Sequence, residues 1–145
     1  MAYVGIVLAL ALVFGLGLLY VTHKMTSAGT KSSGLDKKIV QNKWREIEMS
    51  IGQGGPANFQ SAVMEADKLF DYVLKGIVGN NNQNMGERLK IAQKKFSSWD
   101  VYQGIWAAHK VRNRMAHEMN HELNSAVARN AIEQFRKGLR DLGLL

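Results

Sequence analysis

The segment from residue 109 to residue 121 holds the side chains best suited to chemistry in this chain. Its sequence is HKVRNRMAHEMNH, and it contains three of the four histidines together with an Arg-Asn pair. The apolar residues before it recur at helical spacing, which predicts that the segment lies on a helix. On a helix, positions 109, 113 and 117 follow one another along one face, with position 112 at the edge of that face. Four polar side chains are therefore expected to share the face: His109, Arg112, Asn113 and His117.

These residue types suit cleavage of an RNA backbone without a metal ion. That reaction needs a base for the 2′-hydroxyl proton, an acid for the leaving oxygen and a cation for the charge that develops on phosphorus. Histidine can be acid or base near neutral pH, and the planar fork of arginine matches phosphate oxygens. We expect His117 to be the acid or base, Arg112 to bind the phosphate and Asn113 to orient His117, with His109 as an accessory group.

The run Arg112-Asn113-Arg114-Met115-Ala116-His117 resembles the motif of HEPN (higher eukaryotes and prokaryotes nucleotide-binding) domains. That motif is an Arg and a His separated by four to six residues, often with a polar residue after the Arg. The resemblance covers these six residues in detail and residues 35–143 in architecture. It implies a small helical bundle, usually a homodimer, that binds RNA or nucleotide and carries the motif on a late helix. In ribonuclease members two motifs face each other across the dimer and cut RNA without a cofactor, so a metal-independent endoribonuclease is one possibility.

A metal site is an alternative use of the same helix. Residues 117–121 satisfy the His-Glu-x-x-His spacing and resemble the zinc metallopeptidase helix, in which both histidines bind one zinc ion. His117 and His121 would be the ligands, and Glu118 would act on the bound water. The charged Glu122 directly after the second histidine argues against this site, as does the expected end of the helix nearby. A third ligand, such as Glu133, would have to come from the next helix.

A structural role for the segment is the remaining interpretation. Charged and amide side chains on a late helix can tie the helices of a bundle together. In that case Glu65 or Asp67 pairs with Arg112 or Arg114, and His109 is a partly buried, hydrogen-bonded side chain beside Trp106. The chain would then be a non-enzymatic module for dimerisation or interaction.

The charge of the chain favours an acidic partner. Net charge is +7, and seven basic residues lie between Arg88 and Arg114 against one acidic residue, Asp100. Such a surface could contact RNA phosphates, with Lys110 and Arg114 beside the motif. It could equally be a solvated face that is attracted to an anionic membrane leaflet. The absence of cysteine excludes disulfides and thiolate metal sites.

Five predicted helices would hold residues 109–121 in place. Apolar residues spaced by three and four predict helices over residues 35–51, 57–77, 85–96, 98 to about 120–124, and 125–142. Ser97 or Ser98, and Asn124 or Ser125, are expected to cap the last two helices. Short connections favour antiparallel neighbours, so we expect an all-α, four- to five-helix up-and-down bundle over residues 35–145.

The first 23 residues predict a transmembrane anchor. Residues 2–21 carry no charge, and at about 1.5 Å per residue their helix would cross a hydrocarbon core of about 30 Å. No basic residue precedes this run, and its length exceeds that of the apolar core of a cleaved signal peptide. Lysines follow it, so the positive-inside tendency predicts a single-pass membrane protein with a cytoplasmic C-terminal domain. The Ser-, Thr- and Gly-rich residues 24–34 predict a flexible linker.

Overall fold

The computed structural model describes residues 35–79, 82–117 and 123–145. The chain divides by its contacts into two units, Met1–Ser32 and Ser33–Leu145, and every described residue belongs to the second. The predicted anchor at residues 2–21 and the predicted linker at residues 24–34 lie outside the described residues, so both stay predictions. None of the helices in the described ranges is long and apolar enough to cross a membrane.

The regular elements of the described part are all helical. In chain order they are α2 (Lys37–Gln53), α3 (Pro56–Val78), α4 (Met85–Ile91), the 3₁₀ turn η1 (Ala92–Lys95), α5 (Trp99–His117) and α6 (Ser125–Asp141). The five predicted helices are therefore present, and the all-α class is confirmed. The predicted cap at Asn124 is also present, since its side-chain oxygen accepts a hydrogen bond from the Val127 amide at 2.9 Å. The end of α5, predicted near residues 120–124, falls largely among residues outside the described ranges.

The third predicted helix is shorter than its apolar spacing suggests. α4 ends at Ile91, η1 continues it as a tighter turn, and Phe96 then adopts an extended backbone with φ −87° and ψ 141°. The cause is tertiary packing, because the Phe96 ring lies 6.3 Å from the Phe70 ring and 6.1 Å from the Tyr102 ring. Burial of a phenylalanine is worth more than the intrinsic helix preference of the few residues involved.

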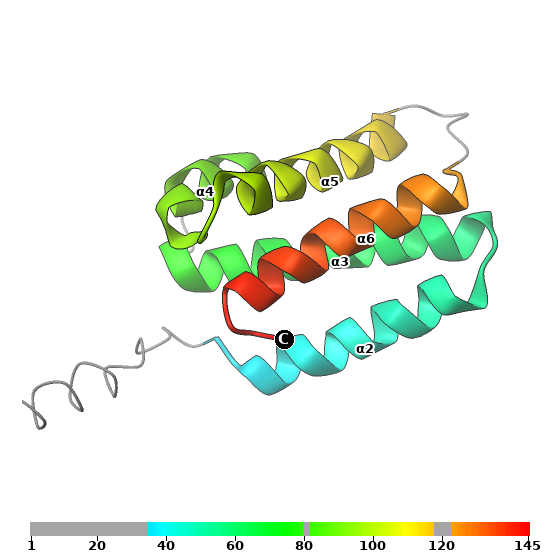
Figure 1. The fold of residues 1–145 in the computed structure, drawn as a ribbon, viewed down its shortest axis with the longest axis horizontal. Helices are drawn as coiled ribbons and strands as arrows, with labels where there is room; N and C mark the ends of the chain where they lie inside the picture. Colours follow the sequence, from blue (N-terminus) through cyan, green and yellow to red (C-terminus); the bar gives the residue numbers. More distant parts are fainter. Residues whose placement is uncertain (1–34, 80–81, 118–122) are drawn as a thin grey trace, which may run out of the picture. The chain divides into compact units, whose positions relative to one another are not determined.

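Four long helices form an up-and-down bundle. α2 and α5 run in one direction and α3 and α6 in the other, so neighbours along the chain are antiparallel (Figure 1). α3 packs against α2 and α6, and α5 packs against α6 and α3, while α4 and η1 lie in the connection from α3 to α5. The predicted helical bundle is confirmed, and its core comprises the apolar stripes that the helices turn toward one another.

The core is tightest where α6 crosses α3 and α5. The rings of Phe70 and Phe135 lie 5.6 Å apart, and both side chains are fully buried together with Ile105. A Cβ atom added to Gly138 would lie 2.8 Å from both Ile105 Cδ1 and Phe70 Cε2. The absence of a side chain at this position therefore allows α6 to approach its two neighbours.

Gly138→Ala should lower the free energy of unfolding by about 1–3 kcal/mol, because the added methyl group displaces core side chains. The better helix propensity of alanine, worth about 1 kcal/mol, offsets only part of this loss. Urea denaturation of residues 33–145 measures the change. Gly52→Ala is the matched control, since Gly52 also lies in a helix but an added Cβ meets no atom within 4 Å. Equal effects in the two variants would contradict the close approach of α6.

The first and last described residues lie at the same end of the bundle, which we call the entry end. Leu35 lies against Gly76 near the end of α3, and Lys37 Nζ donates a hydrogen bond to the Gly143 carbonyl oxygen at 2.7 Å. The Ser97 amide, just before α5, donates to the Asp141 carboxylate at 2.8 Å. The starts of α2 and α5 and the ends of α3 and α6 therefore meet there (Figure 1). His117 lies at the opposite end of α5.

Candidate functional site

Asp67 on α3 is the centre of a polar network that joins α3 to α5. The residue is only 4% exposed. Its Oδ1 atom lies 2.7 Å from His109 Nδ1, and its Oδ2 atom lies 3.3 Å from Arg112 Nε. The contact with Arg112 is an ion pair without hydrogen-bond geometry, because the buried Nε has no hydrogen-bond partner. The pairing of Asp67 with Arg112, which the structural interpretation expected, is confirmed.

Asn113 closes this arrangement into a ring, which we call the Asp67 network: Asp67, His109, Arg112 and Asn113. The Asn113 amide nitrogen lies 3.1 Å from His109 Nε2, and Arg112 Nη1 donates to Asn113 Oδ1 at 3.2 Å. A carboxylate only accepts hydrogen bonds, so we assign a proton to His109 Nδ1, which leaves Nε2 to accept from Asn113. Both ring nitrogens of His109 are then occupied, one by Asp67 and one by Asn113.

Trp106 and Gly86 place His109 beside a groove. The rings of Trp106 and His109 lie 6.0 Å apart in an edge-to-face arrangement, as expected for a partly buried histidine next to Trp106. On α4, a Cβ at Gly86 would lie 3.0 Å from Trp106 Cη2, so glycine lets the indole ring lie close to α4. Between α3, α4 and α5 lies an open groove of about 660 Å³, with the Asp67 network in its wall.

The charges of this groove balance one another. Its walls hold three basic side chains and three acidic ones: Lys68, Lys90, Arg112, Asp67, Asp71 and Glu87. The acidic groups also have partners within the bundle, since Asp71 accepts from Arg88 at 2.7 Å and Glu87 accepts from the Asn84 amide at 2.8 Å. The groove by itself is therefore not a strong anion site, and the capacity to bind phosphate has to come from cations beside it.

Such cations lie on the exposed side of α5. Lys110, Arg114 and His117 are exposed, and among the residues that the structure describes none of the three has a hydrogen-bond or ion-pair partner. Lys110, Asn113 and Arg114 line a shallow depression on this side, and Asn113 also lines the groove. We call Lys110, Arg114 and His117 the α5 cations. Asn113 thus connects them to the Asp67 network.

The predicted site is brought together only in part. His109, Arg112 and Asn113 are in contact, whereas His117 lies one turn beyond Asn113, exposed, at the end of α5. The RNA-cleavage hypothesis did not include Asp67 among the site residues. In the sequence, Asp67 is distinguished only by directly following Ala66, a position of the apolar stripe of α3. Its burial depends on the crossing of α5 over α3.

The basic residues between Arg88 and Arg114 lie in separate parts of the fold. Arg88 is buried against Asp71, and Arg112 belongs to the Asp67 network. The exposed Lys90, Lys94 and Lys95 lie on α4 and η1, near the entry end, apart from the α5 cations.

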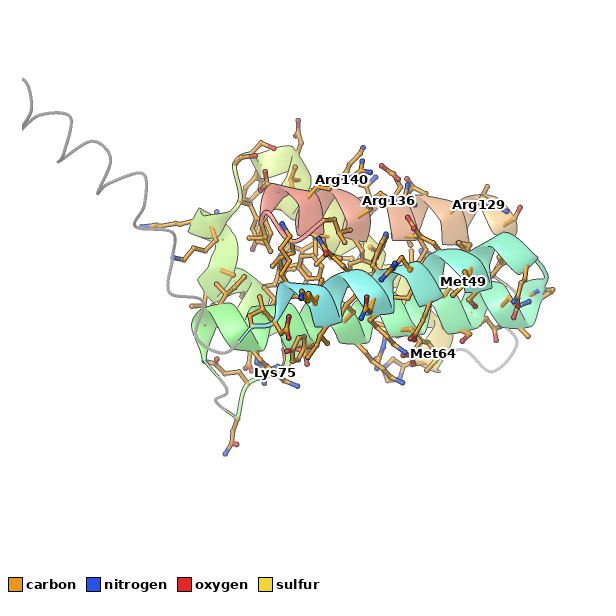
Figure 2. All side chains as sticks on the ribbon, turned by 90° about the horizontal axis from the view of Figure 1, so that it is seen from below. Met49, Met64, Lys75, Arg129, Arg136 and Arg140 are labelled. Atoms are coloured by element: carbon orange, nitrogen blue, oxygen red, sulfur yellow. The ribbon has the colours of Figure 1, made fainter. Side chains whose placement is uncertain are left out.

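A row of arginines on α6 was not singled out by the sequence patterns. Figure 2 shows Arg129, Arg136 and Arg140 following one another along this helix. Arg136 forms ion pairs with Glu48 at 2.9 Å and with Glu133 at 2.8 Å, and its guanidinium lies 5.8 Å from the Trp44 ring centroid. The middle of this row therefore joins α6 to α2, which gives it a structural use.

The zinc alternative cannot be placed in the fold, because Glu118 and His121 lie outside the described residues. Within the described ranges no group of three or more His, Asp or Glu side chains could hold a metal ion. Glu133, considered as a third ligand, forms an ion pair with Arg136.

Comparisons with models of protein families, with curated proteins and with solved structures found no match. The resemblance to HEPN domains therefore depends on the six residues from Arg112 to His117 and on the helical bundle that carries them.

Proposed function

We propose that this bundle binds single-stranded RNA along α5 as a homodimer and cleaves it without a metal ion, as HEPN ribonucleases do. One observation carries the proposal: the Asp67 network holds Arg112 and Asn113 in place at an open surface, one helical turn from the exposed His117. RNA cleavage requires a positioned cation for the phosphate and an accessible imidazole that can exchange a proton.

Arg112 keeps donors for a phosphate despite its partners. A guanidinium carries five N–H groups, of which Nε faces Asp67 and one on Nη1 is donated to Asn113. The side chain is 32% exposed and lines the groove, so we assign the remaining donors to a ligand there. The α5 cations then extend the positive surface along the RNA backbone.

The proposed reaction is transfer of the phosphoryl group within the RNA. His117 of one copy takes the 2′-hydroxyl proton, and the 2′ oxygen attacks phosphorus to form a 2′,3′-cyclic phosphate. The bond to the 5′ oxygen breaks, and His117 of a second copy gives that oxygen a proton. Arg112 stabilises the negative charge on the phosphoryl oxygens in the transition state. His109 positions Arg112 through Asp67 and Asn113, since both of its own ring nitrogens are occupied.

RNA binding by the α5 cations is tested with a fluorescent single-stranded RNA. Replacing Lys110 and Arg114 by glutamine should weaken binding about tenfold and lower the slope of log K against log salt by about 0.7 per lost phosphate contact. The matched control replaces Arg45 and Lys137, two exposed cations on α2 and α6, by glutamine. Anisotropy titrations measure both quantities. Equal loss in the two variants would show that binding follows net charge and not α5.

A non-enzymatic interaction module is the second candidate. The observation that favours it is the closure of the Asp67 network within one bundle, where it ties α5 to α3. A network of this kind stabilises the fold whether or not a ligand binds. Stable dimers that neither bind nor cleave RNA would favour this candidate over the nuclease.

A further inference from the structure

Exposed apolar and basic side chains gather where α4 turns through η1 into α5. Ile91 is 54% exposed and Trp99 is 60% exposed, and the two lie eight residues apart in the chain. Three exposed lysines lie in the same ten residues: Lys90, Lys94 and Lys95. We call these five residues the α4–η1 corner. Three acidic residues border the corner: Glu87 three residues before Lys90, Asp100 directly after Trp99, and Asp141, whose carboxylate accepts from the Ser97 amide.

This corner lies at the entry end of the bundle. α4 and η1 follow the end of α3, where Gly76 contacts Leu35, the first described residue. Residues 22–34 separate Leu35 from the uncharged stretch at residues 2–21 that predicts a membrane span. A linker of that length and composition extends about 20 Å on average. A chain anchored by residues 2–21 would therefore keep the corner within reach of the bilayer surface.

We propose that the α4–η1 corner docks on an anionic bilayer surface, with the three lysines among the lipid headgroups and Trp99 and Ile91 at their acyl boundary. Lysines near a membrane are attracted by anionic lipids, and tryptophan favours the level of the headgroups.

The side chains favour a bilayer over RNA as the partner of this corner. Lysines and a tryptophan would suit either, but Ile91 gains nothing from phosphates or from base stacking, whereas it gains from transfer into an apolar layer. Docking would also leave the other end of α5, residues 109–117, free for a substrate. His117 lies about 27 Å along α5 from Trp99, at a rise of 1.5 Å per residue. The docking inference does not depend on RNA cleavage.

The first experiment mixes residues 33–145, a compact unit with its own core, with sedimenting vesicles. Vesicles of phosphatidylcholine with phosphatidylglycerol should bind the protein, and vesicles of phosphatidylcholine alone should bind it at least tenfold more weakly. Replacing Lys90, Lys94 and Lys95 by glutamine should reduce binding to the anionic vesicles at least tenfold, and so should the pair Ile91→Ala and Trp99→Ala. These side chains are exposed, so circular dichroism should show that both variants fold.

A matched variant removes the same charge elsewhere. Arg45, Arg129 and Lys137 are exposed cations on α2 and α6 and are not corner residues; Figure 2 shows Arg129 on α6. Their replacement by glutamine should change vesicle binding less than twofold. The inference is wrong if this control loses as much binding as the lysine variant, or if the parent does not bind anionic vesicles. It is also wrong if the corner lysines affect RNA binding only, which would make the corner an RNA surface.

The full chain provides an independent measurement. Reconstituted into anionic bilayers, it should show slower amide hydrogen exchange over residues 90–99 than in neutral bilayers, and the lysine variant should abolish that difference. Exchange over residues 109–117 should be the same in both lipids. Equal exchange of residues 90–99 in the two bilayers would overturn docking and leave the RNA proposal untouched.

Discussion

Asp67→Ala should lower the free energy of unfolding by about 3 kcal/mol, the cost typical of removing one partner from a buried ion pair. The residue is 4% exposed, and its carboxylate meets both His109 and Arg112. Without the carboxylate, the His109 Nδ1–H group and the buried Arg112 Nε lose their partner and cannot reach water freely. Urea denaturation of residues 33–145 measures the loss, and the α5 segment should show the largest increase in amide exchange.

Two further variants show whether the loss comes from the network. Asp67→Asn keeps an acceptor for His109 but removes the charge opposite Arg112. It should therefore lower the free energy of unfolding by about half as much as Asp67→Ala does. Glu65→Ala, two residues earlier on α3, removes a partly exposed carboxylate that pairs with Lys68 and Lys43, and it should cost less than about 1 kcal/mol. A Glu65 variant as unstable as the Asp67 variant would contradict the central place of Asp67.

The effect of Glu65→Ala on stability is also expected to depend on pH. The hydrogen bond from Lys68, followed by that from Lys43, holds the pKa of Glu65 below its usual value, although burial acts in the opposite direction. A lowered folded-state pKa means that the stabilisation is fully present above the unfolded pKa and is lost as pH falls through the folded pKa. The difference in stability between Glu65→Ala and the parent should therefore shrink in acid.

His117→Ala should reduce RNA cleavage by at least a hundredfold, because a general acid or base contributes about 10²–10⁴ in rate. The side chain is exposed and has no hydrogen-bond or ion-pair partner among the described residues, so the free energy of unfolding should change by less than about 0.5 kcal/mol. The assay incubates single-stranded RNA with parent and variant in excess chelator and identifies the product ends. Cleavage by the parent alone, with 2′,3′-cyclic phosphate ends, is the expected result.

His121→Ala distinguishes this chemistry from the zinc alternative. A metal-independent nuclease should keep its activity in this variant and in chelator, whereas a zinc site built on His117 and His121 should lose activity in both. If the folded, dimeric parent cleaves no RNA under either condition, the nuclease proposal fails and the interaction module takes its place. The variant also shows whether a residue outside the described ranges takes part in the reaction.

The sequence by itself determined the helices and their buried faces. Helix formation and amphipathic patterning are local, so spacings of three and four residues located all five helices and most of the apolar positions that the bundle buries. Buried residues beside the predicted stripes, such as Tyr102 and Ile132, were not found. The cap at Asn124 was found for the same reason, because its hydrogen bond closes within three residues. The shortening of α4 was not found, since it follows from the packing of the Phe96 ring against Phe70 on α3 and Tyr102 on α5.

Along α5, helical periodicity predicted some features of the candidate site, and tertiary packing decided the others. Helical periodicity placed His109 and Asn113 next to each other, one turn apart, and their contact confirms it. The same periodicity puts Arg112 and His117 about 140° apart around the helix, so they cannot both face α3. Only the crossing of α5 over α3 decided that Arg112 turns to the buried Asp67 while His117 stays in solvent. That choice depends on contacts between residues more than forty positions apart, and no local pattern encodes such contacts.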